Sequence, residues 1–237
     1  RPWIRRNPSL RRIQHLGGEG RPDEEIYKTL AVAAVQEVAD VFEPVYRQTQ
    51  GQDGFVSIEV SPLLAANTAG TISEAQELYA RVNRKNVMIK IPATVEGIPA
   101  VEEVISKGIP VNVTLIFAVE RYREVMEAYL TGLDRRAEAG LPLNAVASVA
   151  SFFVSRVDSA VDKRLEQMIA AASDRSVQEL YRSLLGKSAI ANSKAAYGAF
   201  EETFASDRFR ALKKAGAQFQ RPLWASTGTK NPSYSDV

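Results

Sequence analysis

The sequence contains no cysteine and a single histidine, His15. Without cysteine the chain can form neither a disulfide framework nor a thiolate nucleophile, a composition that fits a reducing compartment. Because His15 lies in a polar, glycine-rich stretch, the sequence also argues against histidine-based catalytic triads and most zinc sites. Any chemistry must therefore come from other side chains.

Long apolar runs and a large net charge are also missing. No apolar run reaches the roughly 18 residues that a membrane-spanning helix requires, and no signal-peptide pattern precedes the first helical segment. The formal net charge is only +2, which gives no electrostatic argument for binding nucleic acid. Hydrophobic residues make up 45% of the chain and charged residues 24%, as in ordinary globular proteins. We therefore expect a soluble cytoplasmic protein with no membrane or nucleic-acid partner.

The first 22 residues differ in composition from the rest of the chain. Residues 1–20 carry five arginines and no acidic residue before Glu19. A basic arm can bind nucleic acid, but this one lacks the interleaved aromatic residues and the recognition-helix pattern of such segments. We therefore predict a disordered basic arm over residues 1–22 and a folded domain over residues 23–237.

Helical and extended patterns alternate after residue 22. Apolar residues recur with a helical period from Asp23 to about Gln48, and Pro44 is expected to kink or split this helix. Strand-like segments follow, separated by helical ones, at residues 55–62, 87–94, 109–117, 145–153 and 217–227. This order predicts an α/β fold with a parallel sheet and right-handed crossovers. An open doubly wound sheet and a TIM barrel both satisfy it.

Polar residues inside the strand-like segments favour the barrel. Strands of an open α/β sheet contact helices on both faces, so both phases of each strand should be apolar. Here five polar residues lie on the phase opposite the main apolar residues of their segments, namely Glu59, Lys90, Asn112, Thr114 and Ser151. We interpret them as the lining of a shared interior near the catalytic mouth of a barrel. The alternative is a set of unrelated residues at strand ends.

Lys90 is the most unusual of these residues, because it interrupts the apolar run VMIKIPAT. A lysine buried on both sides without a partner costs several kcal/mol unless the site uses it. Loss of hydration favours the neutral amine, which is the form that attacks a ketone to give a Schiff base. The alternative is a lysine at a strand end that extends its ammonium group into water.

The other polar residues supply groups that such chemistry needs. Glu59, alone or through a water held by Thr114, could accept protons during dehydration and carbon–carbon cleavage. Asn112 could bind substrate hydroxyls, and Ser151 and Arg156 flank a strand-to-helix turn of the kind that favours phosphate. Taken singly, Glu59 fits a salt bridge at the rim equally well, and Arg156 a surface helix position.

Five segments, in this order along the chain, resemble the transaldolase family: VSIEVSPLLAANTAGTISEA, VMIKIPATVEGIPAV, IPVNVTLIFAVERY, AVASVASFFVSRVD and QRPLWASTGTKNPSYSD. The resemblance extends from about Glu24 to Val237 and is closest to the branch that carries KIPAT and WASTGTKNP segments. It implies a TIM barrel that needs neither cofactor nor metal. It also implies transfer of a dihydroxyacetone unit from a ketose phosphate (sedoheptulose 7-phosphate or fructose 6-phosphate) to an aldose phosphate, in the non-oxidative pentose phosphate pathway.

The same resemblance implies a role for each candidate residue. Lys90 takes the place of the Schiff-base lysine, with Glu59 in the proton relay and Thr114 holding its water. The substrate-binding positions, including a later phosphate site that is matched only as a region, are Asn112, Ser151, Phe153, Arg156 and the segment from Ser226 to Lys230.

Two departures from the family pattern concern the ends of the sequence. No segment matches the family's first strand with its catalytic aspartate, and the chain stops at Val237, before the expected last strand. Asn7-Pro8-Ser9 only partly resembles the end of the second strand. We therefore expect residues 23–237 to form an incomplete barrel with weak or no turnover by itself. A fructose 6-phosphate aldolase-like enzyme and a non-catalytic barrel fragment remain as alternatives, and a homodimer is compatible with either enzyme.

Overall fold

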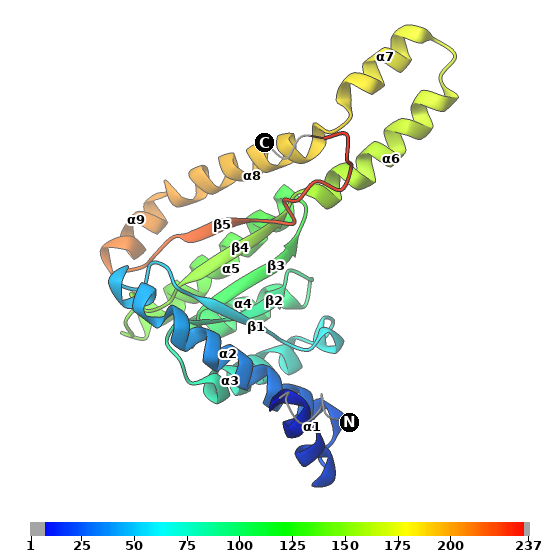
Figure 1. Ribbon diagram of the computed structural model, residues 1–237. Helices are drawn as coiled ribbons and strands as arrows, with labels where there is room; N and C mark the ends of the chain where they lie inside the picture. Colours follow the sequence, from blue (N-terminus) through cyan, green and yellow to red (C-terminus); the bar gives the residue numbers. More distant parts are fainter. Residues whose placement is uncertain (1–7, 235–237) are drawn as a thin grey trace.

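A computed structural model describes residues 8–234, which contain one parallel five-stranded sheet (Figure 1). Its strands follow the order of the chain: β1 (Val56–Glu59), β2 (Val87–Pro92), β3 (Val111–Ile116), β4 (Ser148–Phe153) and β5 (Gln220–Ala225). A doubly wound sheet reverses its strand order at a switch point, whereas this order never reverses. The sheet does not close within the described residues, because β1 and β5 each have one neighbour. The arrangement is consistent with an incomplete barrel, as the sequence predicts.

Helices connect the strands and cover one face of the sheet. They are α2 (Asp23–Gln48), α3 (Thr68–Val82), α4 (Gly97–Ser106) and α5 (Val119–Glu138), preceded by α1 (Pro8–Gly18), with a short 3-10 helix, η2 (Pro62–Leu64), after β1. Between β4 and β5 the chain forms α6 (Ser155–Ala171), α7 (Arg175–Leu184), α8 (Ser188–Phe204) and α9 (Asp207–Lys214). Helices α6 and α7 project beyond the ends of the strands, and α8 returns toward the sheet (Figure 1). None of the helices in residues 8–234 is long and apolar enough to cross a membrane.

Two features near the start of the chain differ from expectation. Residues 8–18, within the predicted disordered arm, form α1, which contacts α2; residues 1–7 of that arm lie outside the described residues. The division of the chain at residue 22 stays a prediction. Helix α2 continues through Pro44 without splitting, although a proline removes a backbone hydrogen bond and crowds the preceding turn. Buried Val32 and Ala39 hold the helix to the body.

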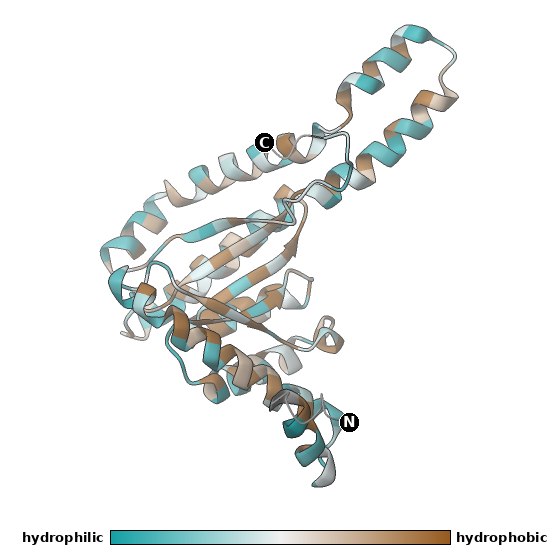
Figure 2. Cartoon of the chain, viewed as in Figure 1, coloured by the Kyte–Doolittle hydropathy of each residue, from teal (hydrophilic) through white to brown (hydrophobic). Residues whose placement is uncertain are grey.

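The two faces of the sheet differ sharply in polarity. The face against the helices forms the main core, in which Ile89, Ile91, Val111 and Val113 are fully buried. Figure 2 shows hydrophobic residues concentrated along the strands, whereas hydrophilic residues are frequent in α6 and α7. The opposite face, called the open face below, carries the alternate residues of each strand. A small apolar cluster of Met88, Ala147, Val149 and partly buried Phe55 lies on it.

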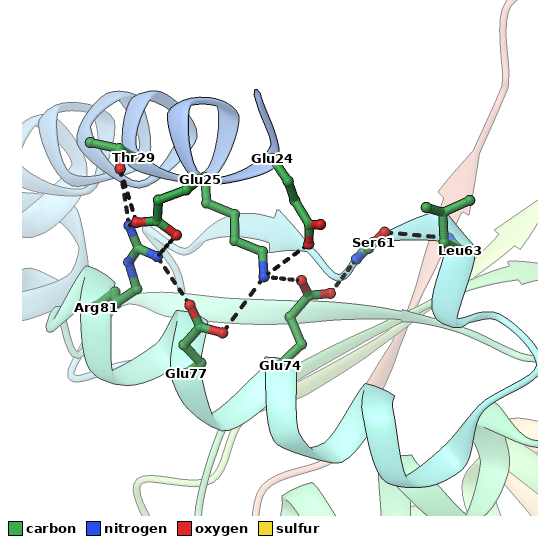
Figure 3. A network of polar contacts seen from close by, with 9 residues as sticks. Glu24, Glu25, Thr29, Ser61, Leu63, Glu74, Glu77 and Arg81 are labelled. Carbon is green, nitrogen blue, oxygen red and sulfur yellow. Dashed lines mark hydrogen bonds and ion pairs between the residues drawn. The ribbon is translucent and has the colours of Figure 1, made fainter. Parts of the chain in front are cut away.

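A polar network fixes the loop that follows β1 (Figure 3). The ammonium group of Lys28 on α2 lies 2.8 Å from Glu74, 3.3 Å from Glu24 and 3.6 Å from Glu77. Glu74 is 6% exposed, and its second oxygen accepts a hydrogen bond from the backbone N–H of Ser61. The hydrogen bond with Glu74 raises the pKa of Lys28 above its ordinary value. The network therefore ties α2 and α3 to the carboxyl end of β1.

This network predicts a measurable contribution to stability. We expect Glu74→Ala to lower the free energy of unfolding by roughly 1–3 kcal/mol, because it removes a charged acceptor from Lys28 and from a backbone N–H. Urea denaturation measures the change. The control is Glu179→Ala, which breaks a pair with Arg175 whose side chains are 63% and 89% exposed and should cost much less. Equal losses in the two variants would contradict the assigned role of Glu74.

Candidate active site

The register of the sheet brings candidate residues together on the open face. Glu59 pairs with Lys90 and Lys90 with Asn112, and register partners in a parallel sheet point to the same side. Ser151 lies two residues beyond Val149, the register partner of Asn112, and so shares that side. The alternation in the sequence predicted this shared face.

Lys90 and Glu59 form an ion pair across β1 and β2. The lysine Nζ lies 3.2 Å from the Oε2 of Glu59, and the two side chains are 30% and 48% exposed. The expectation that Lys90 is buried on both sides without a partner is therefore wrong. Its neighbours Ile89 and Ile91 are fully buried, but Lys90 itself points to the open face. The sequence of β2 alone could not show that β1 places the carboxylate of Glu59 beside Lys90.

Asn112 joins three strands through its side-chain amide. Its Nδ2 donates to the Oγ of Ser57 over 3.1 Å, and its Oδ1 accepts from the Oγ of Ser151 over 2.8 Å. Asn112 and Ser151 are both buried, so these bonds fix the amide orientation beside Lys90. Ser57 was not among the sequence candidates, although it shares the phase of Glu59 in its strand.

Thr114 places a hydroxyl in the same site without a protein partner. The residue is 1% exposed, and its Oγ1 is buried and makes no hydrogen bond within the described part of the chain. Leaving a buried hydroxyl unpaired is costly.

Phe153 and Arg156 lie where β4 passes into α6. The Cζ of Arg156 lies 4.9 Å from the centroid of the Phe153 ring, a cation–π contact. Arg156 is exposed and pairs with no carboxylate among residues 8–234. Its guanidinium is therefore available to bind an anion. The two parallel N–H donors of a guanidinium match the geometry of a phosphate group.

Ser226 brings the end of β5 to the first turn of α6. Its Oγ lies 3.0 Å from the Oγ of Ser155, and its carbonyl oxygen accepts from the Ser155 N–H over 2.9 Å. Ser226 has a φ of +55°, which is uncommon for a serine and often marks a functional turn. Two hydroxyls, the N-terminus of α6 and Arg156 thus gather in one region that can attract an anion.

Lys230 lies near the Ser226 region, because it lines one cavity with Ser155, the hydrogen-bond partner of Ser226. It is exposed and lines a cavity of about 350 Å³ with Asp158, Asp162 and Tyr234. No hydrogen bond or ion pair joins it to the other candidates in the described part of the chain. The segment after Ser226 turns over α6, where the hydroxyl of Tyr234 donates to Asp162 over 2.7 Å. Burial and this hydrogen bond raise the pKa of Tyr234 to about 12.

The arrangement supports one kind of chemistry on the open face. An amine that can add to a carbonyl lies beside a carboxylate that can take up protons. The amide of Asn112 and the unpaired hydroxyl of Thr114 lie on β3. The guanidinium of Arg156 lies beyond the end of β4. No set of three or more His, Cys, Asp or Glu within the described residues could hold a metal ion.

Comparison with known proteins gives consistent matches over nearly the whole chain. A sequence model of the family described as "Transaldolase/Fructose-6-phosphate aldolase" matches residues 6–237. A protein named "Transaldolase" from Saccharopolyspora erythraea is 51% identical over 225 residues, which cover 95% of this chain and 58% of that protein. "Transaldolase 1" from Streptomyces avermitilis is 51% identical over 243 residues, covering 98% of this chain and 62% of the relative. "Transaldolase" from Thermobifida fusca is 50% identical over 225 residues, covering 95% and 59%. The chain thus spans about three fifths of the length of these curated relatives.

Proposed function

The chain belongs to the transaldolase/fructose-6-phosphate aldolase family, and from that premise we propose that it acts as a transaldolase. In this proposal it transfers a dihydroxyacetone unit from a ketose phosphate, sedoheptulose 7-phosphate or fructose 6-phosphate, to an aldose phosphate. The observation that carries the proposal is the pair of Lys90 and Glu59, 3.2 Å apart on the open face. A TIM barrel with a Schiff-base lysine is the family's arrangement for this reaction.

The first half of the reaction uses Lys90 as the nucleophile. The Lys90 ammonium first gives a proton to Glu59, its ion-pair partner. The neutral amine then adds to the C2 carbonyl of the ketose, and the carbinolamine hydroxyl takes that proton and leaves as water to give an iminium ion. The iminium withdraws electrons from the C3–C4 bond when a base removes the proton of the C4 hydroxyl. In this proposal Glu59 accepts that proton, directly or through a water held at Thr114. The bond breaks, the aldose phosphate leaves, and a three-carbon enamine stays on Lys90.

The second half reverses these steps on a new aldehyde. The enamine carbon attacks the carbonyl of the acceptor aldose phosphate, whose oxygen takes a proton as the new C3–C4 bond forms. Water then hydrolyses the iminium and regenerates the Lys90 amine. Asn112 binds the hydroxyls of the three-carbon unit, and Arg156 with Ser226 binds the phosphate of donor or acceptor. Lys230 is assigned to this phosphate site on resemblance alone.

A fructose 6-phosphate aldolase is the second candidate, because the family description includes that activity. Both enzymes form the same lysine adduct, and they differ in what removes it. The test is a chase: the adduct is formed with fructose 6-phosphate, and erythrose 4-phosphate is added before borohydride reduction. A transaldolase discharges the adduct to sedoheptulose 7-phosphate. An aldolase releases free dihydroxyacetone at the same rate with or without acceptor, which would contradict our proposal. A chain that forms no adduct at all would support the non-catalytic fragment.

Thr114 gives a prediction that separates function from stability. We expect Thr114→Val to slow adduct formation by about tenfold or more, because the hydroxyl that orients the proton relay is lost. The free energy of unfolding should stay equal or rise, since the Oγ1 of Thr114 has no protein partner. Borohydride trapping and urea denaturation measure the two quantities.

The control for Thr114 is Thr131→Val on α5. The Thr131 hydroxyl donates to Glu127 and accepts from Arg208, so this change should lower stability without affecting trapping. A Thr114→Val protein that traps at the wild-type rate would remove Thr114 from the mechanism.

The homodimer and the cytoplasmic location predicted from the sequence stay predictions.

A further inference from the structure

A one-residue bulge interrupts β3 just after Thr114. Between Val113 and Ile116, β3 advances three residues while its neighbour β4 advances two. Leu115, within the bulge, has a φ of +60°. A leucine holds this conformation only where the surrounding structure compensates for the strain, and bulges of this kind re-aim the side chains that follow.

The bulge reverses the direction in which Phe117 faces. In an unbroken strand Phe117 would share the phase of Val113 and face the helices. With the extra residue it lies instead on the open face, where its ring centroid is 5.2 Å from that of Phe153. Phe117 is 38% exposed, so burial in the main core does not explain its position.

The backbone of Phe117 is held from a second direction. The side-chain amide of Asn192 on α8 donates to the Phe117 carbonyl oxygen over 2.7 Å. Helix α8 is itself attached to α6, since Asp158 accepts the N–H of Ala189 over 2.8 Å. The Phe117 ring therefore stands on a supported backbone beside the start of α6.

The ring of Phe117 contacts the ring of Phe153, which in turn contacts the guanidinium of Arg156. Phe153 contacts both residues: its ring centroid lies 5.2 Å from that of Phe117 and 4.9 Å from the Cζ of Arg156. Arg156 has no carboxylate partner in the described residues, so the Phe153 ring is the contact that orients its long side chain. A guanidinium held in one direction loses less freedom when it binds an anion than one that moves freely.

We propose that Phe117 is a positioning residue: through Phe153 it holds Arg156 toward the substrate phosphate and sets the preference for phosphorylated ketoses. The inference deepens the proposed function and rests on it. The expected signature is selective. Phe117→Ala should weaken the use of a phosphorylated donor and leave an unphosphorylated one unchanged, whereas a general structural role would affect both.

The experiment compares two donors in the borohydride trapping reaction. Half-saturating concentrations are measured with fructose 6-phosphate and with dihydroxyacetone, which carries no phosphate. For Phe117→Ala we expect the value for fructose 6-phosphate to rise roughly threefold to tenfold, the range that an aromatic pair is worth, with no change for dihydroxyacetone. Arg156→Met should give the same pattern, and Phe117→Tyr, which keeps the ring, should behave as wild type.

Phe219→Ala is the matched control. Phe219 is also 38% exposed and also carries a cation, with the Nζ of Lys213 at 4.6 Å from its ring, but it lies in a separate aromatic cluster with Phe200, Phe204 and Phe209. Its loss should change neither half-saturating concentration. Isothermal titration with inorganic phosphate gives a second reading that does not depend on the lysine chemistry.

The outcomes separate the inference from the proposed function. A wild-type chain that traps neither donor contradicts the proposed function, and the phosphate titration then decides the inference. If Arg156→Met weakens phosphate or fructose 6-phosphate binding and Phe117→Ala does not, Phe117 is no positioning residue. Equal effects of Phe117→Ala on both donors, or no phosphate-dependent binding in the wild type, would also overturn the inference.

Discussion

Lys90→Met is expected to abolish borohydride trapping of fructose 6-phosphate while leaving the fold nearly intact. The methionine has a similar length but no amine, so no Schiff base can form. Lys90 is 30% exposed and its ion pair is with Glu59, so its replacement leaves no fully buried charge behind. Mass spectrometry of the reduced protein measures the adduct, and urea denaturation measures the fold.

Lys107→Met is the control for this change. Lys107 also forms an ion pair with a glutamate, Glu103, at 3.1 Å, and its side chain is 42% exposed, but it lies at the end of α4 and not on the sheet. The variant should trap fructose 6-phosphate as the wild type does. A Lys90→Met protein that still forms an adduct would show that another lysine is the nucleophile.

Glu59→Gln is expected to slow adduct formation by about 100-fold, within the range that a general base contributes. The amide keeps the size of the side chain, but it can neither donate the proton that carbinolamine dehydration consumes nor take up the proton that carbon–carbon cleavage releases. Lys90 remains in place, so the adduct should still form, slowly, on the same residue. The rate of trapping after rapid mixing with fructose 6-phosphate and borohydride measures the effect.

Two further variants define the role of the Glu59 carboxylate. Glu59→Asp keeps the base at a greater distance from Lys90 and should give a rate between those of the wild type and Glu59→Gln. Glu103→Gln removes the partner of Lys107 and of Arg135 and should leave the rate unchanged. Trapping by Glu59→Gln at the wild-type rate would reduce Glu59 to a salt-bridge partner.

Local patterns predicted the elements well where the signal lies within one segment. The acidic first turn and the apolar period of α2 gave its bounds, Asp23 and Gln48, as the structure has them. The strands followed from short apolar runs between glycines and helical segments. The shared open face also followed, because alternation along one strand assigns each residue a side before any partner strand is known.

Features that depend on two strands at once could not be predicted. The partner of Lys90 is set by the register of β1 against β2, and no property of either segment alone contains that register. The bulge at Leu115 could not be predicted either, because nothing in the segment VNVTLIF indicates that this leucine has a positive φ. For the same reason the sequence missed Phe117, whose phase places it on the helix side until the bulge is known.

The location of the reduced adduct tests most directly whether Lys90 is the nucleophile. The chain is incubated with fructose 6-phosphate, reduced with borohydride and digested, and the peptides are sequenced by mass spectrometry. We predict a three-carbon adduct on the peptide that contains Lys90 and on no other lysine peptide. An adduct on a different lysine, such as Lys28 or Lys230, or the absence of any adduct, would contradict the claim that Lys90, paired with Glu59 on the open face, is the nucleophile.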